Sequence, residues 1–465
     1  MIVLPKQAED DMKKIISLII CLCVMLTLSS VSAFSQTTAT AQDLTKTNTV
    51  KLSSNANGKL LSDEKRTTKL TLKAGTKITI SNTQQFSSIY VIWDKPPGEW
   101  TLTINGVDQT YGKNEFIHEY IDLSNLTNEV TITIKSDSVI LCDVYTFTSN
   151  QTPDWVQKWA PSYENADMLL MPTHADDELI FFGGTIPYYA GEKGLKVQVA
   201  YMTNHWGEPY RPHEALNALW ACGLTAYPVM GAFPDIYSTS LVHAKKVYNY
   251  NNIVNYEIEL IRRFKPEVII AHDLKGEYGH GGHMINANAL TEALTKSNDS
   301  SISPESAQKY GVWDVPKTYL HLYGENKVKM NWDIPLSKFN GKTAYEMAVI
   351  GFSYHSSQQQ WYSVKKTPGV YDCQAFGLYR TTVGPDIAKN DFMENIKLEE
   401  EKKPEESSVI DSSPDSQSSS TTDEKKPSTT EKNEDYKAYV YIAGSVVVVG
   451  IVLIIFMQGK KKNKK

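Results

Sequence analysis

The stretch DMLLMPTHADDELIFF (residues 167–182) joins an apolar, strand-like run to one histidine and three acidic side chains. Polar groups this dense beside a buried strand are costly unless something binds them. His174 and Asp177, spaced His-x-x-Asp in a loop that leaves a strand, can place two ligands on one metal ion, with Asp176 between them as a base. The alternative is that Asp176 to Glu178 form an acidic helix N-terminus, which the helix dipole favours.

Outward from this stretch, strand-like runs alternate with helical ones. The runs with strand character are KVQVAYMTN (196–204), YPVMGAF (227–233) and PEVIIAHD (266–273), and the helical ones include PHEALNALWACG (212–223) and NNIVNYEIELIRRF (251–264). This alternation predicts a Rossmann-like α/β domain at residues 155–385 with a mainly parallel sheet. Ligands of such folds bind beyond the carboxyl ends of the strands.

A second polar cluster, HDLKGEYGHGGH (272–283), follows another predicted strand about a hundred residues later. Because both clusters leave the same edge of the sheet, we expect them to converge. His280 and His283, spaced His-x-x-His among glycines, can direct one imidazole at a metal and the other at a substrate. Tyr278 adds a hydroxyl group. Together the two clusters favour a metal site over an acidic helix start.

Four motifs follow one another along this segment: THADDE (173–178), RPHEALNALWACG (211–223), EYGHGGH (277–283) and YHSSQ (354–358). In this order they resemble the LmbE/PIG-L family of zinc-dependent de-N-acetylases. The signature of that family is His-Pro-Asp-Asp-Glu followed later by Gly-His-Pro-Asp-His. The resemblance covers about residues 165–385 and implies a domain like an N-acetylglucosaminyl deacetylase.

The resemblance implies a role for each matching residue. Zinc would be held by His174, Asp177 and His283; Asp176 would be the general base; His280 would stabilise or protonate; and Tyr278 and Arg211 would contact the substrate. The chemistry agrees, since three protein ligands leave a position for water, whose pKa zinc lowers to about 7. The same ligands also suit another divalent ion such as Fe²⁺. From the residues alone, Arg211 could equally pair with Glu214 on a helix surface.

Two departures from the family pattern concern the ligand loops. Ala175 stands where the family has proline, so this loop is expected to be less rigid. Gly281 and Gly282 stand where the family has Pro-Asp, which removes a carboxylate that could orient a histidine. Neither change removes a ligand, so metal binding is expected to survive.

Residues 46–150 read as β-structure. Runs such as KLTLKAGTKITISN (69–82) alternate apolar and polar residues between turn-forming clusters, which predicts an all-β sandwich. The domain loosely resembles galactose-binding-like sandwiches. Trp93, Trp100 and Tyr111 could form a sugar-stacking platform, although core or turn positions are the favoured reading.

The two ends of the chain predict export and anchoring. Residues 1–33 have a basic start, an apolar run and a small-residue cleavage site, typical of a signal peptide; an uncleaved anchor is the alternative. Residues 395–436 are too polar for a core and predict a disordered linker. Residues 438–457 are uncharged over a length that spans a bilayer, and the basic tail at 458–465 is expected in the cytosol.

Together, the resemblance and the topology predict a single-pass cell-membrane zinc amidohydrolase with its catalytic domain outside the cytoplasm. Its partner would be an N-acetylated amino sugar, of the N-acetylglucosamine type, in a glycan or glycoconjugate. The alternatives are a catalytically degenerate surface carbohydrate-binding protein and an amidase for another acyl group. A formal net charge of −6 without a basic domain argues against nucleic acid. Cys142, Cys222 and Cys373 indicate buried thiols with at most one bridge.

Overall fold

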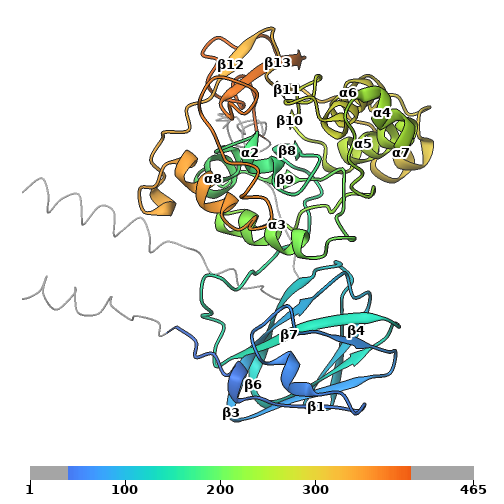
Figure 1. The fold of residues 1–465 in the computed structure, drawn as a ribbon, viewed down its shortest axis with the longest axis vertical. Helices are drawn as coiled ribbons and strands as arrows, with labels where there is room; N and C mark the ends of the chain where they lie inside the picture. The colour runs from blue at the N-terminus through green and yellow to red at the C-terminus, as the bar shows by residue number, and fades with distance from the viewer. Residues whose placement is uncertain (1–39, 399–465) are drawn as a thin grey trace, which may run out of the picture. The chain divides into compact units, whose positions relative to one another are not determined.

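The computed structural model describes residues 40–398 (Figure 1). The predicted signal peptide at 1–33, the predicted membrane helix at 438–457 and the basic tail at 458–465 lie outside the described residues, as does the linker from residue 399 onward. Within residues 40–398, no helix is both long and apolar enough to cross a membrane.

The first part of the described chain forms one antiparallel sheet of seven strands. They are β1 (Thr49–Leu52), β2 (Leu70–Leu72), β3 (Lys77–Trp93), β4 (Trp100–Ile104), β5 (Val107–Tyr111), β6 (His118–Ile134) and β7 (Val139–Phe147). The short 3-10 helices η1 (Thr45–Thr47) and η2 (Gly58–Leu61) accompany them. The strand order is β2-β7-β3-β6-β4-β5, with β1 paired to β3.

The predicted sandwich of two separate sheets is not confirmed. β3 is 17 residues long and changes partners along its length: β1 pairs with Ile78–Ser81, whereas β7 pairs from Ser88 onward. The register of β3 against β6 shifts on both sides of Phe86. Because a long strand with a register shift can bend and still pair throughout, hydrogen bonds link all seven strands into one sheet.

Burial shows whether the aromatic side chains of this region could bind a sugar and whether its cysteine is a buried thiol. Trp93 and Trp100 are 0% and 1% exposed, so their rings belong to the core and cannot stack on a sugar. Tyr111 stacks on Trp100 at a centroid distance of 5.1 Å. Cys142, like Cys222 and Cys373, is a buried free thiol, as predicted.

The second part of the chain is built on a six-stranded sheet in the order β12-β13-β11-β10-β8-β9. Its strands are β8 (Met168–Met171), β9 (Val197–Val199), β10 (Val268–Ala271), β11 (Lys317–His321), β12 (Lys327–Lys329) and β13 (Ala375–Thr381). β9, β8, β10 and β11 run parallel, but β13 pairs antiparallel with both β11 and β12. The sheet is therefore mixed, and a Rossmann-like, mainly parallel sheet is not confirmed.

Helices connect these strands and pack around the sheet (Figure 1). They are α2 (Asp177–Ile180), η3 (Ile186–Glu192), α3 (Tyr210–Ala221), α4 (Leu241–Val247), α5 (Tyr250–Phe264), α6 (Gly281–Lys296), α7 (Pro304–Tyr310), η4 (Ser337–Phe339) and α8 (Ala344–Phe352). α5 shows how the sequence specifies them: the Asn249 side chain caps its first turn, and apolar residues such as Ile253 and Ile261 form its buried face.

One predicted strand is wrong. The run at 227–233 makes only single bridges, Ala200 to Val229 and Thr203 to Phe233. Pro228 lacks the N–H that a ladder needs, and a Cβ at Gly231 would lie 2.0 Å from the Met202 carbonyl oxygen. The segment therefore pairs only irregularly with the residues that follow β9.

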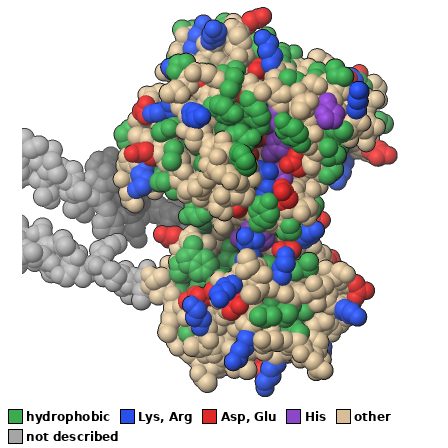
Figure 2. Space-filling view, in the orientation of Figure 1, with side chains coloured by type: hydrophobic (Ala, Val, Ile, Leu, Met, Phe, Trp, Pro, Cys, Tyr) green, Lys and Arg blue, Asp and Glu red, His purple; other side chains and the backbone are tan. Residues whose placement is uncertain are grey.

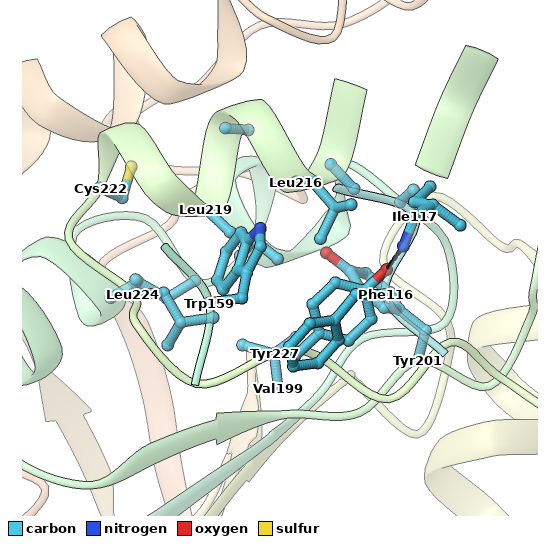
Figure 3. Packing of buried hydrophobic residues seen from close by; sticks show 14 of the residues in the cluster. Phe116, Ile117, Trp159, Val199, Tyr201, Leu216, Leu219, Cys222, Leu224 and Tyr227 are labelled. Carbon is cyan, nitrogen blue, oxygen red and sulfur yellow. Dashed lines mark hydrogen bonds between the residues drawn. The ribbon is translucent and has the colours of Figure 1, made fainter. Parts of the chain in front are cut away.

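The β-sheet part and the α/β part contact each other through aromatic side chains. Phe116 and Tyr227 have ring centroids 4.5 Å apart, and the Ile117 N–H donates to the Tyr227 hydroxyl at 3.1 Å (Figure 3). Trp159 packs edge-on against Tyr227 on its other side. In the space-filling view, histidine side chains reach the surface beside hydrophobic ones (Figure 2).

Candidate active site

A pocket of about 380 Å³ opens where the chain leaves β8, beside the segments that follow β9 and β10. Six of the seven residues predicted for the site line it: His174, Asp176, Asp177, Arg211, Tyr278 and His280. The seventh, His283, is fully buried and contacts the pocket residues His174 and Asp177. The fold therefore brings all seven predicted residues together, although more than a hundred positions separate the two clusters.

The three residues predicted as metal ligands present one donor atom each to a common point. His174 Nδ1 is 3.1 Å from Asp177 Oδ2 and 3.2 Å from His283 Nε2, and the latter two atoms are 3.3 Å apart. Donors at about 2.0–2.1 Å from a tetrahedral zinc ion stand about 3.3 Å from one another. The triangle therefore has the size that such an ion requires.

The protonation of His283 supports the same conclusion. Its Nδ1 lies 2.7 Å from Glu277 Oε2, so Nδ1 carries the proton and Nε2 presents a lone pair. This lone pair faces an oxygen of Asp177, a second acceptor. Acceptors that face one another in this way fit a bound cation.

Three other groupings of ligand-type residues lie close together. One of them, His174 with His280 and His283, replaces the carboxylate of Asp177 with the imidazole of His280. The other two are less suitable. His272 lies near Asp177 and His283, but its Nε2 already accepts the Thr173 N–H at 3.0 Å, so this lone pair is not free for a metal. His205 lies near Glu208 and Asp235. Its Nε2 accepts the Ala175 N–H at 3.1 Å, so a neutral ring carries its proton on Nδ1, the nitrogen that faces Asp235 at 3.5 Å.

Asp176, the predicted base, is held in an unusual backbone conformation. Its φ of 134° lies in a region that non-glycine residues seldom adopt, and such strain persists only where the surroundings impose it. The Asp176 N–H donates to Glu178 Oε2 at 2.8 Å, and Arg211 Nη2 is 3.4 Å from Asp176 Oδ2. Burial raises the pKa of Asp176 to about 7, and Arg211 opposes that rise. A carboxyl group with such a pKa suits proton transfer near neutral pH.

His280 and Tyr278 approach the pocket from the loop before α6. The His280 ring centroid is 4.8 Å from that of His174, and its Nδ1 has no hydrogen-bond partner among residues 40–398. Burial and the neighbouring His174 lower the pKa of His280 to about 3, so the ring is neutral. Tyr278 is 38% exposed, and its hydroxyl is 3.3 Å from that of Tyr362.

Arg211 is buried at the start of α3 and does not make the helix-surface pair with Glu214. Its Nη2 donates to the Ala175 carbonyl oxygen at 2.6 Å. Glu214 instead accepts from the hydroxyls of Ser356 and Ser357, at 2.6 Å each. Arg211 therefore holds the loop in which alanine replaces the family's proline.

Three further acidic residues contact the predicted site residues. The sequence suggested a helix-start position for Glu178, which lies in the first turn of α2, and no role for Asp235 or Glu277. Glu178 accepts from His355 at 2.8 Å and from the backbone of Asp176. Asp235 lies 3.4 Å from His174 Nε2 and 3.7 Å from Arg211 Nη1. Glu277 faces several histidines. Glu178 and Glu277 stand inside the quoted motifs, so their position was a signal, whereas Asp235 follows the irregular segment at 227–233 and belongs to no quoted motif.

Part of the chain is similar to known deacetylases. Residues 169–294 match the family described as PIG-L: GlcNAc-PI de-N-acetylase. A 1D-myo-inositol 2-acetamido-2-deoxy-alpha-D-glucopyranoside deacetylase of Rhodococcus erythropolis is 30% identical over 179 residues, which are 33% of this chain and 59% of that protein. The chain thus spans less than two thirds of the length of this relative.

Two solved structures are also similar in part. The N,N'-diacetylchitobiose deacetylase from Pyrococcus horikoshii aligns with a TM-score of 0.31 at 18% identity, over 42% of this chain and 72% of that one. The lectin domain of lectinolysin, complexed with Lewis B antigen, aligns with a TM-score of 0.21 at 10% identity, over 24% of this chain and 99% of that one.

Proposed function

Because residues 169–294 form a domain of the PIG-L (LmbE) family, we propose that this protein is a metal-dependent N-deacetylase. Its substrate would be an N-acetylglucosamine-type sugar of a glycan or glycoconjugate. The observation that carries the proposal is the donor triangle of His174, Asp177 and His283, with edges of 3.1–3.3 Å, beside the buried carboxyl group of Asp176.

The metal would be held by His174 Nδ1, Asp177 Oδ2 and His283 Nε2. A bound zinc ion would supply a water molecule of lowered pKa, near 7, and would polarise the amide carbonyl of the substrate. The two histidines and one carboxylate also accept other divalent ions such as Fe²⁺.

Asp176 would move the proton. Its carboxylate, which lines the pocket, accepts a proton from the attacking water and returns it to the departing amine. Arg211, 3.4 Å away, stabilises the ionised form before the transfer. The neutral imidazole of His280, which lines the pocket, can donate a hydrogen bond to the oxygen on which negative charge develops.

The location is a further part of the proposal. The uncharged stretch at 438–457 and the basic residues after it support a membrane anchor, with residues 40–398 outside the cytoplasm. In intact cells, added protease should cleave the globular part from the membrane, and the mature N-terminus should follow residue 33. Protection of residues 40–398 in intact cells, with cleavage only after lysis, would contradict this location.

The activity is tested on the purified full-length chain by measuring metal content together with the acid released from N-acetylated chitooligosaccharides. We expect about one zinc per chain and release of acetate that a chelator abolishes. Asp176→Ala should lower acetate release about 10²- to 10⁴-fold and leave the metal content unchanged. Glycan binding without turnover would favour the carbohydrate-binding alternative, and release of a different acid would identify another acyl group.

A further inference from the structure

Glu277 is a buried acceptor shared by three imidazoles. Its side chain is fully buried, and Oε2 lies 2.7 Å from His283 Nδ1. Oε1 lies 2.9 Å from His272 Nδ1 and 3.1 Å from His321 Nδ1. Oε1 also accepts the Asp273 N–H at 3.0 Å. One carboxylate therefore connects a candidate metal ligand to the ends of two neighbouring strands, since His272 follows β10 and His321 ends β11.

The proton positions at this carboxylate follow from its neighbours. The Nε2 of His272 accepts the Thr173 N–H, so His272 must donate from Nδ1 to Glu277. The contact with His283 at 2.7 Å has the length of a charge-assisted hydrogen bond. It places the His283 proton on Nδ1, on the side of the ring away from Asp177.

The backbone at Glu277 is adapted to this contact. Its φ of 46° is left-handed, a region in which glutamate is uncommon and glycine is unstrained. Gly276 and Gly279, on either side, also have positive φ. The Glu277 side chain holds the residue in this conformation through its contacts with the three imidazoles and with the Asp273 N–H.

The space around Gly282 disfavours an acidic side chain at that position. A Cβ at Gly282 would lie 3.0 Å from His280 Cε1 and 3.3 Å from His174 Nε2. This ring arrangement leaves little room for an acidic side chain at 282, where the resembled family has aspartate. The carboxylate that could orient a histidine in that family is therefore absent at 282, and Glu277 faces His283 instead.

We propose that Glu277 is the positioning residue of the metal centre: it fixes the tautomer and orientation of His283, so that the Nε2 lone pair points to the ion. This inference rests on the proposed function in that it requires a metal at His174, Asp177 and His283. Carboxylates that accept from the remote nitrogen of a ligating histidine typically contribute 10- to 100-fold to metal affinity.

The test uses the substitution Glu277→Gln in the full-length protein, because glutamine keeps the shape but loses the charge. The control is Glu257→Gln, the same change at a buried glutamate whose carboxyl group has no hydrogen-bond partner among the described residues. Zinc affinity is measured by competition with a chelator, and ligand geometry by the visible absorption spectrum of the Co²⁺ form. Glu277→Gln should weaken zinc binding 10- to 100-fold and alter the Co²⁺ spectrum, whereas Glu257→Gln should change neither.

Equal zinc affinity and equal Co²⁺ spectra in the two variants would overturn the proposal. If Glu277→Gln does not fold, ¹⁵N NMR of histidine in the zinc-loaded wild-type protein decides: a proton on His283 Nδ1 is expected, and a proton on Nε2 would overturn it. Failure of the proposed function gives a different result. A wild-type protein that binds zinc with help from Glu277 but releases no acid refutes deacetylation alone, and one that binds no zinc refutes both.

Discussion

Two clusters of buried histidines lie in this molecule, and they differ in what faces the imidazoles. In the candidate active site, His174 and His283 face the carboxylates of Asp177 and Glu277. In the contact between β6 and α3, His118 Nε2 lies 2.6 Å from His213 Nδ1, and His118 Nδ1 lies 2.7 Å from the Tyr90 hydroxyl.

The electrostatic consequences are opposite. Carboxylates raise the pKa of His174 to about 9 despite its burial, which means that this site favours positive charge. At the other cluster, burial lowers the pKa of His118 to about 3 and that of His213 well below its usual range. Buried imidazoles alone therefore form a neutral structural contact, and carboxylates are what turn such a cluster into a cation site.

The largest predicted effect is a loss of folding stability when acidification protonates the neutral cluster of His118 and His213. The unfolded chain protonates His118 below about pH 6.5, but the folded chain resists protonation until about pH 3. Its contribution to stability is thus complete above pH 6.5 and is lost as the pH falls toward 3.

Chemical denaturation between pH 7 and pH 3 measures this loss. The free energy of unfolding of the wild type should fall more steeply than that of the double variant His118→Leu/His213→Leu. His243→Leu, at a partly exposed histidine, serves as control and should follow the wild type. Identical pH profiles for the wild type and the double variant would contradict a neutral pair.

A smaller effect is expected on zinc affinity, which should depend on the active-site histidines and not on the cluster of His118 and His213. His283→Ala removes a donor atom of the triangle, so its zinc affinity should fall by more than the 10- to 100-fold typical of a residue that only orients a ligand. His213→Ala removes a histidine of equal burial from the neutral cluster and should leave zinc affinity unchanged. Chelator competition on both proteins gives the answer, and a loss of zinc in the His213 variant would mean that the second cluster also binds metal.

The smallest effect concerns a buried carboxyl group without imidazoles. Glu257 in α5 is 0% exposed, and burial alone raises its pKa well above the usual range. Glu257→Met replaces an unpaired polar group with an apolar one of similar shape and should raise the free energy of unfolding by about 1–3 kcal/mol. Glu214→Met is the matched contrast, because Glu214 accepts from two serines, and it should be destabilising. The reverse order of stability would refute the unpaired state of Glu257.

Sequence patterns predicted local features better than long-range pairing. The alternating run at 69–82 contains β2 and the start of β3, as expected, but whether these strands join one sheet or two depends on where the long strands bend. The run at 227–233 has an apolar composition typical of a strand, yet its proline and its close approach to Met202 prevent a ladder. The antiparallel β13 follows β12 by a long connection whose direction no local pattern specifies.

The sequence by itself determined the ligand types and their local spacing. His174 and Asp177 lie three positions apart at a helix start, so one tight turn suffices to bring Nδ1 and Oδ2 within 3.1 Å. Glu277 and His283 are likewise neighbours in one glycine-rich turn.

Only the tertiary structure decided which of these groups meet. Parallel pairing of β8 with β10 brings the two loops to one edge of the sheet, and α3 brings Arg211 to the Ala175 carbonyl. These contacts join residues far apart in the chain, and they form because burying both strands and α3 in a common core offsets the entropy of closing the loops between them. Local spacing brings His174 and Asp177 together, but only the packing of the core adds His283 to them.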